Sequence, residues 1–421
     1  AERARHWRAG GDVTRAAQAQ TQAARQALDA FADGEAEALA DAGLGDPLGP
    51  EINARLLEVR AQARRRRGDL AGARGDLRSA LRLHRDGPAR AMTLAQLATL
   101  ASGADDLVRA SELAEMAILE AGPDRSARAQ ALEVAAVLDM NLGRDARAAD
   151  RAAEALEHYT QLGDSRGAAR VLDTRAMAAF FGGDVTGGTE LLHRVANLFE
   201  DSGDLMRQVT PRSTRGHGLV FLGRPIAALA DTSAALEIAR SLGHPEGQAY
   251  ALWHRSEALS ALGEGDEART EAEHARRIAE QLDHRGWMAT AWRAIGIAEQ
   301  ARGEPEAALS AFLQSLELSA NLDLFGSWAA SRAALAAITL GRLSDAEGLV
   351  ARALALGPPL GHYEGRMARV ELSRARGDAS TRKLAAEARR LAESGGALAH
   401  LDRLKELMIG GEGQVFGSPT R

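Results

Sequence analysis

The feature that most constrains the fold of this 421-residue chain is a turn signal that returns every 40 residues. The signal is a glycine followed by a polar residue, and it stands at Gly143-Arg144, Gly183-Asp184, Gly223-Arg224, Gly263-Glu264 and Gly303-Glu304. Similar turns extend the series at Gly11-Asp12, Gly68-Asp69, Asp105-Asp106 and Gly341-Arg342. A constant period of this length is typical of repeat proteins, in which each unit stacks on its neighbour. The spacing predicts about nine repeats.

Small residues occupy three positions in eight of these repeats, counted from the turn residue, and Val195 is the one larger residue among them. Seven residues before it stand Ala61, Ala98, Ala136, Ala176, Gly216, Ser256, Gly296 and Ala334; five after it stand Ala73, Ala110, Ala148, Gly188, Ala228, Ala268, Ala308 and Ala346; and twelve after it stand Ala80, Ala117, Ala155, Val195, Ala235, Ala275, Ser315 and Ala353. Small contact residues let two helices approach closely, because axes about 8–10 Å apart leave no room for long side chains. Each repeat is therefore predicted to be a hairpin of two antiparallel helices.

The composition agrees with helices and excludes several other classes of protein. The chain is rich in alanine, a strong helix former, and has only three tyrosines and eight phenylalanines, which sheets favour. It has no cysteine, so disulfides and thiolate metal sites are excluded. A net charge of -6 is too small to attract nucleic acid or an anionic membrane. With no apolar run long enough to span a bilayer and no signal region, we expect a soluble, cytoplasmic protein.

The spacing of small residues around the turn glycine resembles the tetratricopeptide repeat, over about residues 1–395. The resemblance implies an all-α, right-handed superhelical solenoid with a capping repeat at its C-terminal end. The 40-residue period exceeds the usual 34, and longer helices would absorb the difference. Arrays punctuated by Leu-Gly-Asp or Leu-Gly-His, as at residues 162–164 and 242–244, resemble the C-terminal sensor or scaffold regions of large bacterial signalling ATPases and transcription regulators, such as the maltose-regulon activator.

The pattern divides the chain into four segments. We expect a helical hairpin over residues 1–42, the repeat array over 51–395, a capping helix over 396–409 and a disordered tail over 410–421. The capping interpretation rests on Arg382 and Arg389, which replace small residues after the turn at Gly377. The chain begins with alanine, and we leave open that it is part of a longer regulator.

No catalytic, cofactor or metal signature is present in the sequence, so we predict a protein that is not an enzyme and needs no cofactor. The eleven histidines are scattered rather than spaced as ligands. The run Arg64-Arg65-Arg66-Arg67 ends a predicted first helix, where cations complement the helix dipole. Nucleic-acid binding by this run is a less favoured alternative, because stacking aromatic residues do not accompany it.

The first helix of each hairpin is expected to line the concave face, where solenoids bind their partners. The partner-binding residues predicted from the repeat register are Asn141, Arg170, Asp173, Met177, Phe180, Phe181, Ser213, His217, Phe221, Tyr250, Trp253, Glu257, Arg293 and Trp328. Aromatic and arginine side chains dominate binding hot spots, which supports a recognition surface. Burial of the same rings between turns of the array remains the alternative, and we assign Trp287 and Trp292 to the core between helices.

These residues predict a module that binds a peptide or protein segment in its groove, as the sensor or scaffold region of a bacterial regulator. Asn141, Arg170 and Arg293 would bind the backbone or carboxylate of the segment, and Phe181, Phe221 and Trp253 would anchor its apolar side chains. Replacing Trp253 and Phe221 by alanine is then expected to abolish binding without unfolding. The alternative is a sensor of an oligosaccharide or metabolite that stacks on Tyr250 and Trp253. The identity of the partner and the oligomeric state stay open.

Overall fold

The computed structural model describes residues 2–45, 49–103, 106–320, 322–357 and 359–409. Within these ranges the chain is helical and contains no strand. The tail predicted to be disordered, 410–421, lies outside the described residues. No helix in the described part is long and apolar enough to cross a membrane.

Twenty-two α-helices and one 3₁₀ turn make up the described part of the chain. Three helices precede the regular array, namely α1 (Glu2–Ala9), α2 (Val13–Asp29) and α3 (Asp33–Leu44). The first helices of the hairpins are α4 (Pro50–Arg66), α6 (Pro88–Gly103), α8 (Arg125–Asn141), α10 (Ser165–Phe181), α12 (Leu205–Phe221), α14 (Pro245–Ala261), α16 (Arg285–Ala301), α18 (Asp323–Thr339) and α20 (Pro359–Arg376). Their partners are α5 (Leu70–Leu83), α7 (Leu107–Ala121), α9 (Asp145–Leu162), α11 (Val185–Asp201), α13 (Pro225–Ser241), α15 (Gly265–Gln281), α17 (Pro305–Leu318), α19 (Leu343–Ala355) and α21 (Thr381–Gly395).

The ends of the array differ in detail from the predicted segments. The predicted hairpin 1–42 contains three helices, because Gly10 and Gly11 break the chain after α1. The predicted capping helix 396–409 is a 3₁₀ turn, η1 (Leu398–His400), followed by α22 (Leu401–Ile409). Gly396 has a left-handed φ of 86°, which ends α21 before this segment.

The turn signal at Gly183-Asp184 shows how a hairpin of the array is formed. Gly183 has a φ of 94°, a left-handed conformation that glycine adopts without steric cost. Asp184 then caps α11, since its side chain accepts a 2.8 Å hydrogen bond from the backbone N–H of Gly187. The dipeptide therefore ends one helix and begins the next, as the sequence predicted.

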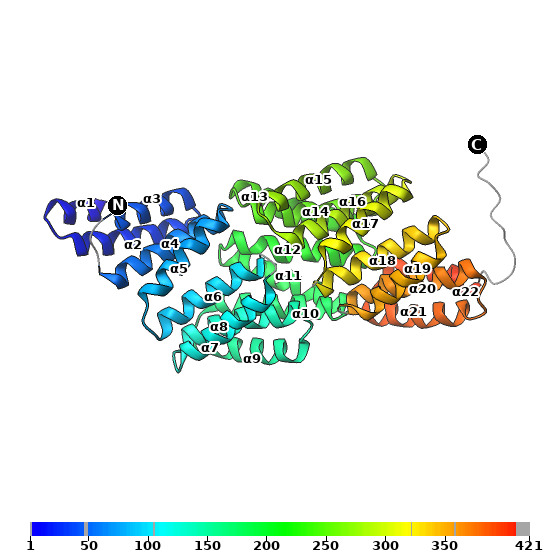
Figure 1. Ribbon diagram of the computed structural model, residues 1–421, viewed down its shortest axis with the longest axis horizontal. Coiled ribbons are helices and arrows are strands. Elements are labelled where there is room, and N and C mark those ends of the chain that lie inside the picture. Colours follow the sequence, from blue (N-terminus) through cyan, green and yellow to red (C-terminus); the bar gives the residue numbers. More distant parts are fainter. Residues whose placement is uncertain (1, 46–48, 104–105, 321, 358, 410–421) are drawn as a thin grey trace.

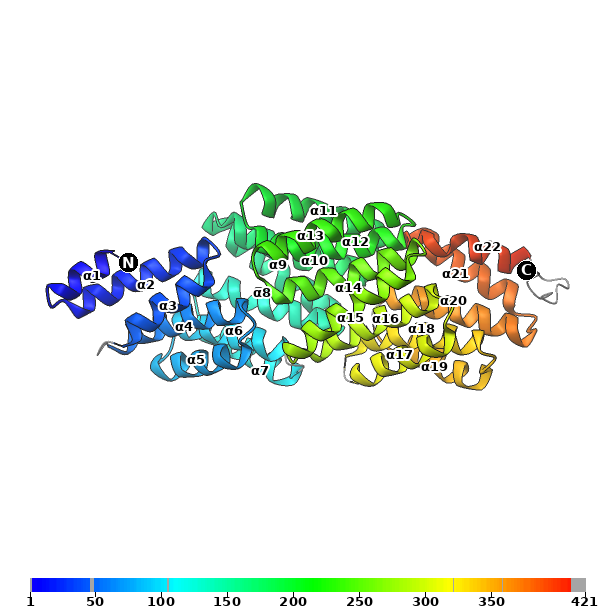
Figure 2. The ribbon, with the colours of Figure 1, turned by 90° about the horizontal axis from the view of Figure 1, so that it is seen from above.

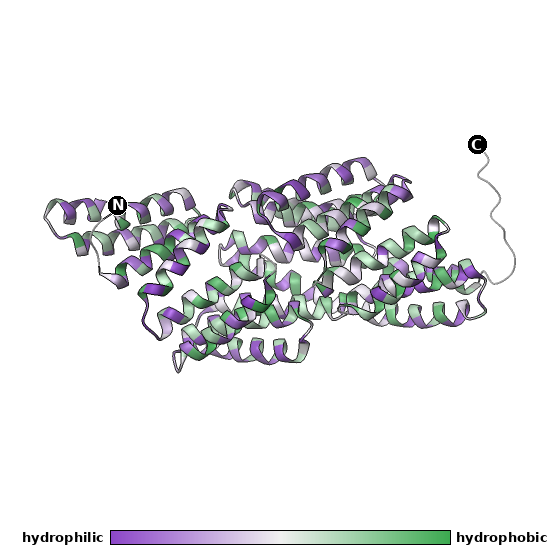
Figure 3. Ribbon diagram, viewed as in Figure 1, coloured by the Kyte–Doolittle hydropathy of each residue, from purple (hydrophilic) through white to green (hydrophobic). Residues whose placement is uncertain are grey.

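The small residues form the seam between paired helices, and all three predicted sets are buried. At two of these positions a side chain would collide with its neighbour. A Cβ on Gly188 would lie 2.6 Å from the backbone of Phe180, and one on Gly296 would lie 2.4 Å from the ring of Phe312. Figure 3 shows the corresponding polarity, with hydrophilic residues along outer helices such as α15.

The hairpins wind into an elongated superhelix whose chain ends lie at opposite ends of the molecule (Figures 1 and 2). Successive turns of this superhelix contact each other. Near the N-terminal end, Arg65 of α4 lies 3.8 Å from Glu246 of α14. Near the C-terminal end, the Tyr363 hydroxyl of α20 donates a 2.7 Å hydrogen bond to the carbonyl of Gly183, 180 residues earlier. The all-α superhelical solenoid predicted from the repeat is confirmed.

Candidate ligand-binding channel

The inside of the superhelix contains a cavity of about 370 Å³. Its wall comes mainly from eight successive first helices, α4 to α18, with smaller contributions from α5, α7 and the turns between helices. Seven of the fourteen predicted partner-binding residues line it, namely Asn141, Met177, Phe181, His217, Tyr250, Trp253 and Trp328. We refer to this cavity and the inner surface that continues it toward the starts of α8, α10 and α12 as the channel.

Aromatic rings form much of the cavity wall. The indole of Trp253 stacks on the ring of His254 with centroids 3.4 Å apart, and Tyr250 meets the Trp253 ring edge to face. The Tyr250 hydroxyl lies 2.9 Å from the Thr214 hydroxyl of α12, which joins two neighbouring first helices. The ring of Trp287 stacks on His284 and is also part of the wall. The cavity therefore offers flat apolar surfaces to a ligand.

The sequence analysis missed two of these wall residues, Trp287 and Phe325. Both stand sixteen residues before the turn glycine, about one helical turn earlier than the first register position that the prediction used. Extending the concave register by one turn would have found them. Trp287 was assigned to the core; it packs on buried neighbours and lines the cavity as well. Trp292 packs on the core, with the guanidinium of Arg276 over its ring.

Polar residues lie where α8 and α10 begin, on the same helix faces as the apolar wall. Arg170 of α10 donates a 2.8 Å hydrogen bond to Glu133 of α8, and the Tyr159 hydroxyl donates a 2.6 Å bond to the same carboxylate. Arg170, predicted to bind a ligand, is therefore already paired. Asp173 stands one turn further along α10, and its Oδ1 is buried without a hydrogen-bond partner among the described residues. Burial raises the pKa of Asp173 to about 7, and nearby Arg207 only partly offsets this effect.

A buried ionic cluster joins four of the first helices further along the array. Arg293 of α16, 2% exposed, pairs with Glu257 of α14 and lies 3.3 Å from Glu364 of α20, which also pairs with Arg332 of α18. Burial alone would raise the pKa of Glu364, but the two guanidinium groups outweigh it and lower the pKa to about 2. Glu257 and Arg293 thus hold four first helices together, and the described cavity wall does not include them.

Three further predicted residues pack in the interior instead of facing the cavity. Phe180 and Phe221 are buried in an apolar cluster with Leu360 and Leu404 from the C-terminal helices. Ser213 is buried and donates a 2.7 Å hydrogen bond to the carbonyl of Val209. The physical reason is the same for both rings: the superhelix brings α20 to α22 against α10 and α12, so these rings are covered.

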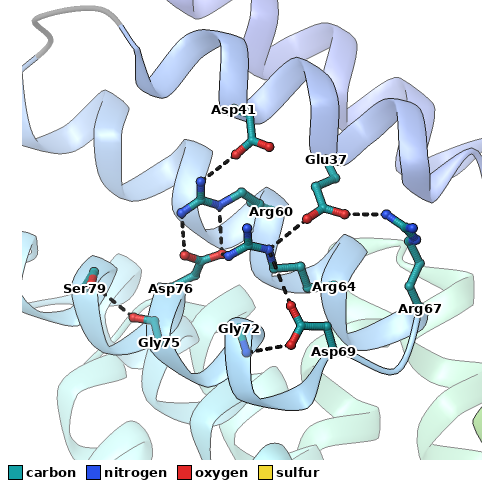
Figure 4. A network of polar contacts seen from close by, with 10 residues as sticks. All are labelled: Glu37, Asp41, Arg60, Arg64, Arg67, Asp69, Gly72, Gly75, Asp76 and Ser79. Carbon is teal, nitrogen blue, oxygen red and sulfur yellow. Dashed lines mark hydrogen bonds and ion pairs between the residues drawn. The ribbon is translucent and has the colours of Figure 1, made fainter.

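The arginine run at the end of α4 is engaged in ion pairs within the protein (Figure 4). Arg64 contacts Glu37 and Asp76, each at 2.9 Å, and Arg67 contacts Glu37 at 2.6 Å. Arg66 pairs with Asp33, and Arg65 with Glu246 as described above. A nucleic acid would have to displace these carboxylates, which argues against the run as a phosphate-binding surface.

The sequence was compared with known protein families and with curated proteins. Residues 247–321, which span α14 to α17, match the Tetratricopeptide repeat family. No curated protein sequence matches the chain. The matched segment is a tetratricopeptide repeat, and the helical hairpins described above continue the same architecture along the described part of the chain.

Solved structures with this architecture are similar at low sequence identity. A Rap protein complexed with Competence and Sporulation Factor has a TM-score of 0.60 and 13% identity, covering 85% of this chain and 99% of that one. NprR in complex with its cognate peptide NprX has a TM-score of 0.53 and 14% identity, covering 75% and 96%. A signal transduction ATPase with a tetratricopeptide repeat sensor, from Pyrococcus horikoshii, has a TM-score of 0.47 and 11% identity, covering 86% and 55%. These likenesses concern the fold.

Proposed function

We propose that this protein is a non-enzymatic module that binds a short peptide, or a flexible segment of another protein, inside the channel. The observation that carries the proposal is the preformed cavity, whose wall is built mainly by eight successive first helices. Pockets of this size, mostly apolar and with a few polar groups, are where proteins bind small ligands and peptide side chains. Two proteins of this architecture were solved in complex, one with Competence and Sporulation Factor and one with a cognate peptide.

Individual side chains of the wall suit an extended peptide. The carboxamide of Asn141 is half-buried and has one donor group and one acceptor for a peptide backbone. Met177 and Phe325, on facing parts of the wall, give adaptable and flat apolar contacts. We assign Phe180, Phe221, Ser213, Glu257 and Arg293 to the structural framework around the channel, and propose that Asn141, Asp173, Met177 and the wall aromatics contact the ligand.

We place this module in a regulator, as its sensor or scaffold region. The wall of the channel belongs to repeats that stack on their neighbours in sequence, and the winding of the superhelix adds contacts between distant repeats, such as Arg65 to Glu246 and Tyr363 to Gly183. A ligand that touches several first helices at once would favour one curvature of the array over another, provided that it binds the two curvatures with different affinity. Such a shift is a physical route from binding to signal.

A second candidate is a sensor of a sugar or other small metabolite. The cluster of the Tyr250, Trp253 and His254 rings favours it, because planar aromatic faces bind the apolar faces of small ring compounds. The enclosed shape of the cavity suits a small molecule as well as a peptide side chain. The binding experiment described next separates the peptide candidate from the metabolite candidate.

The test uses a substitution that places a large side chain in the channel and leaves no void in the core. Val137 is half-buried on the cavity wall, and Val137→Trp would occupy the space of the ligand. Leu119→Trp on the outside of α7, at a position 80% exposed, is the matched control. Trp253→Ala and Phe221→Ala are unsuitable, because both side chains are buried and their loss is expected to destabilise the fold.

We expect a pool of short peptides, screened by thermal shift and measured by calorimetry, to contain members that bind the original chain and Leu119→Trp but not Val137→Trp. A parallel pool of sugars and metabolites tests the second candidate. Binding of peptides by Val137→Trp at undiminished affinity would contradict the channel as the site. Binding confined to the metabolite pool would replace the peptide proposal by the sensor proposal.

A further inference from the structure

We infer that the ligand carries a positively charged amino group, which pairs with Asp173, next to an apolar part that enters the cavity. This inference rests on the proposed function, because it specifies the chemistry of the ligand bound in the same channel. The argument starts from the position of Asp173 and from the charges around it.

Asp173 lies on α10 one turn before the wall residue Met177, and the cavity wall does not itself include Asp173. It precedes the wall residue Met177 by four positions on α10, and residues four apart lie on the same face of a helix. Phe181 follows four positions later on the wall. The inner face of α10 therefore presents a carboxylate followed by two apolar side chains, in line along the channel.

The carboxylate of Asp173 has no ion pair among the described residues, although charged groups surround it. Its Oδ1 is buried and accepts no hydrogen bond there. Arg170 on the same helix is held by Glu133 and Tyr159. Arg207 of α12 acts on Asp173 only at a distance, and its paired acid is Asp204, at 3.5 Å. The protein thus leaves one half-buried carboxylate of the channel uncompensated, with its Oδ1 covered.

A buried carboxylate without a partner is costly, and a cation supplied by a ligand would remove that cost. The raised pKa of Asp173 agrees with this picture, since burial opposes its ionisation in the empty channel. An anionic group at the same place would lie next to the charges of Asp173 and Glu133. The charges at this point of the channel therefore favour an ammonium over a carboxylate.

The spacing along α10 limits the distance between the two parts of the ligand. Four residues of helix advance by about 6 Å, so the amino group and the apolar group are separated by about that length. A flexible chain of four carbons spans this distance. The amino terminus of a peptide with an apolar first or second residue also satisfies it, as does a lysine beside an apolar residue.

Three probes with one skeleton test the inference on the full chain at pH 8. They are 4-phenylbutylamine, 4-phenylbutan-1-ol and 4-phenylbutanoate, which are positive, neutral and negative. We expect calorimetry to show the amine binding at least ten times more tightly than the alcohol, and the carboxylate binding most weakly. Asp173→Asn is expected to make the affinities of amine and alcohol equal. Asp150→Asn, which removes an exposed carboxylate on the outer helix α9, is the matched control and should keep the preference.

Equal binding of amine and alcohol by the original chain would overturn the inference, as would a preference for the amine that survives in Asp173→Asn. If peptides bind and Val137→Trp blocks them while none of the probes binds, the inference fails and the proposed function stands. If neither peptides nor probes bind, the proposed function fails and the inference fails with it. Circular dichroism confirms that each variant is folded.

Discussion

At the scale of single residues, the inner surface contains buried charges of two kinds. Glu364 is buried and stabilised by two arginines, so its pKa falls to about 2. Asp173 is half-buried with its Oδ1 covered and has no ion pair among the described residues, so its pKa rises to about 7. A group that is compensated within the fold belongs to the structural framework, whereas a group left uncompensated is a candidate for a ligand. Removing the charge of Asp173 is therefore expected to stabilise the protein, whereas removing an arginine partner of Glu364 is expected to destabilise it.

Asp173→Asn is expected to stabilise the empty protein, and more so at high pH. Because the folded-state pKa is raised above the unfolded value of about 4, ionisation opposes folding; the cost begins as the pH rises above 4 and is complete above 7. We expect the substitution to raise the free energy of unfolding by about 1–3 kcal/mol more at pH 8 than at pH 5. Urea unfolding at both pH values measures it. An effect of equal size at the two pH values would contradict the assignment.

Arg293→Met is expected to destabilise the protein by about 3–5 kcal/mol, because it leaves Glu257 and part of the charge of Glu364 buried without a partner. The exposed pair of Arg389 and Glu393 on α21 gives the control, since Arg389→Met should change stability by less than about 1 kcal/mol. Chemical denaturation measures the free energy of unfolding of both variants. A loss below 1 kcal/mol for Arg293→Met would show that the cluster does not hold the four helices together.

At the scale of helices, glycine has different roles at different positions. Gly188 is part of the seam, and a methyl group there would collide with the backbone of Phe180. Gly348 lies in the exposed middle of α19, where a methyl group would meet nothing within 4 Å. We expect Gly188→Ala to lower stability by about 1–3 kcal/mol and Gly348→Ala to raise it by about 0.5–1 kcal/mol. Thermal unfolding measures both, and a stabilising Gly188→Ala would mean that the seam is looser than described.

Elements of the hairpin could be predicted from the sequence because each one is determined locally. The turn at Gly183-Asp184 and the small residue Gly188 act on helices that are neighbours in the chain. The concave position of Met177, Tyr250 and Trp253 followed from the same register, and the cavity includes all three. Their binding of a ligand stays a prediction.

Which inner residues face the cavity and which are buried depends on contacts between distant repeats, and the repeat period does not describe these contacts. Phe180 and Phe221 were placed correctly on first helices, but the C-terminal helices cover them. Arg293 finds Glu364 at a separation of 71 residues, and no local pattern predicts that pair. The uncompensated state of Asp173 likewise depends on the positions of Arg170 and Arg207 on two helices. Winding of the superhelix, rather than the repeat itself, decides which inner residues are free.

At the scale of the whole molecule, the winding brings distant repeats together around the channel. Contacts such as Arg65 to Glu246 and Tyr363 to Gly183 join successive turns of the superhelix (Figures 1 and 2), and residues of the first helices line the cavity. A ligand in that position contacts repeats far apart in sequence, which is what a sensor region requires. The central claim is that binding takes place inside this channel.

Photo-methionine in place of methionine throughout the chain tests this claim most directly. Met140 and Met177 lie on the cavity wall, whereas Met116 is 38% exposed on α7. We would irradiate the labelled protein with a pool of hexapeptides tagged at the C-terminus and map the cross-links by mass spectrometry. The account predicts cross-links at Met140 and Met177 that an excess of untagged peptide removes. Competed cross-links at Met116, with none at the two channel residues, would contradict it.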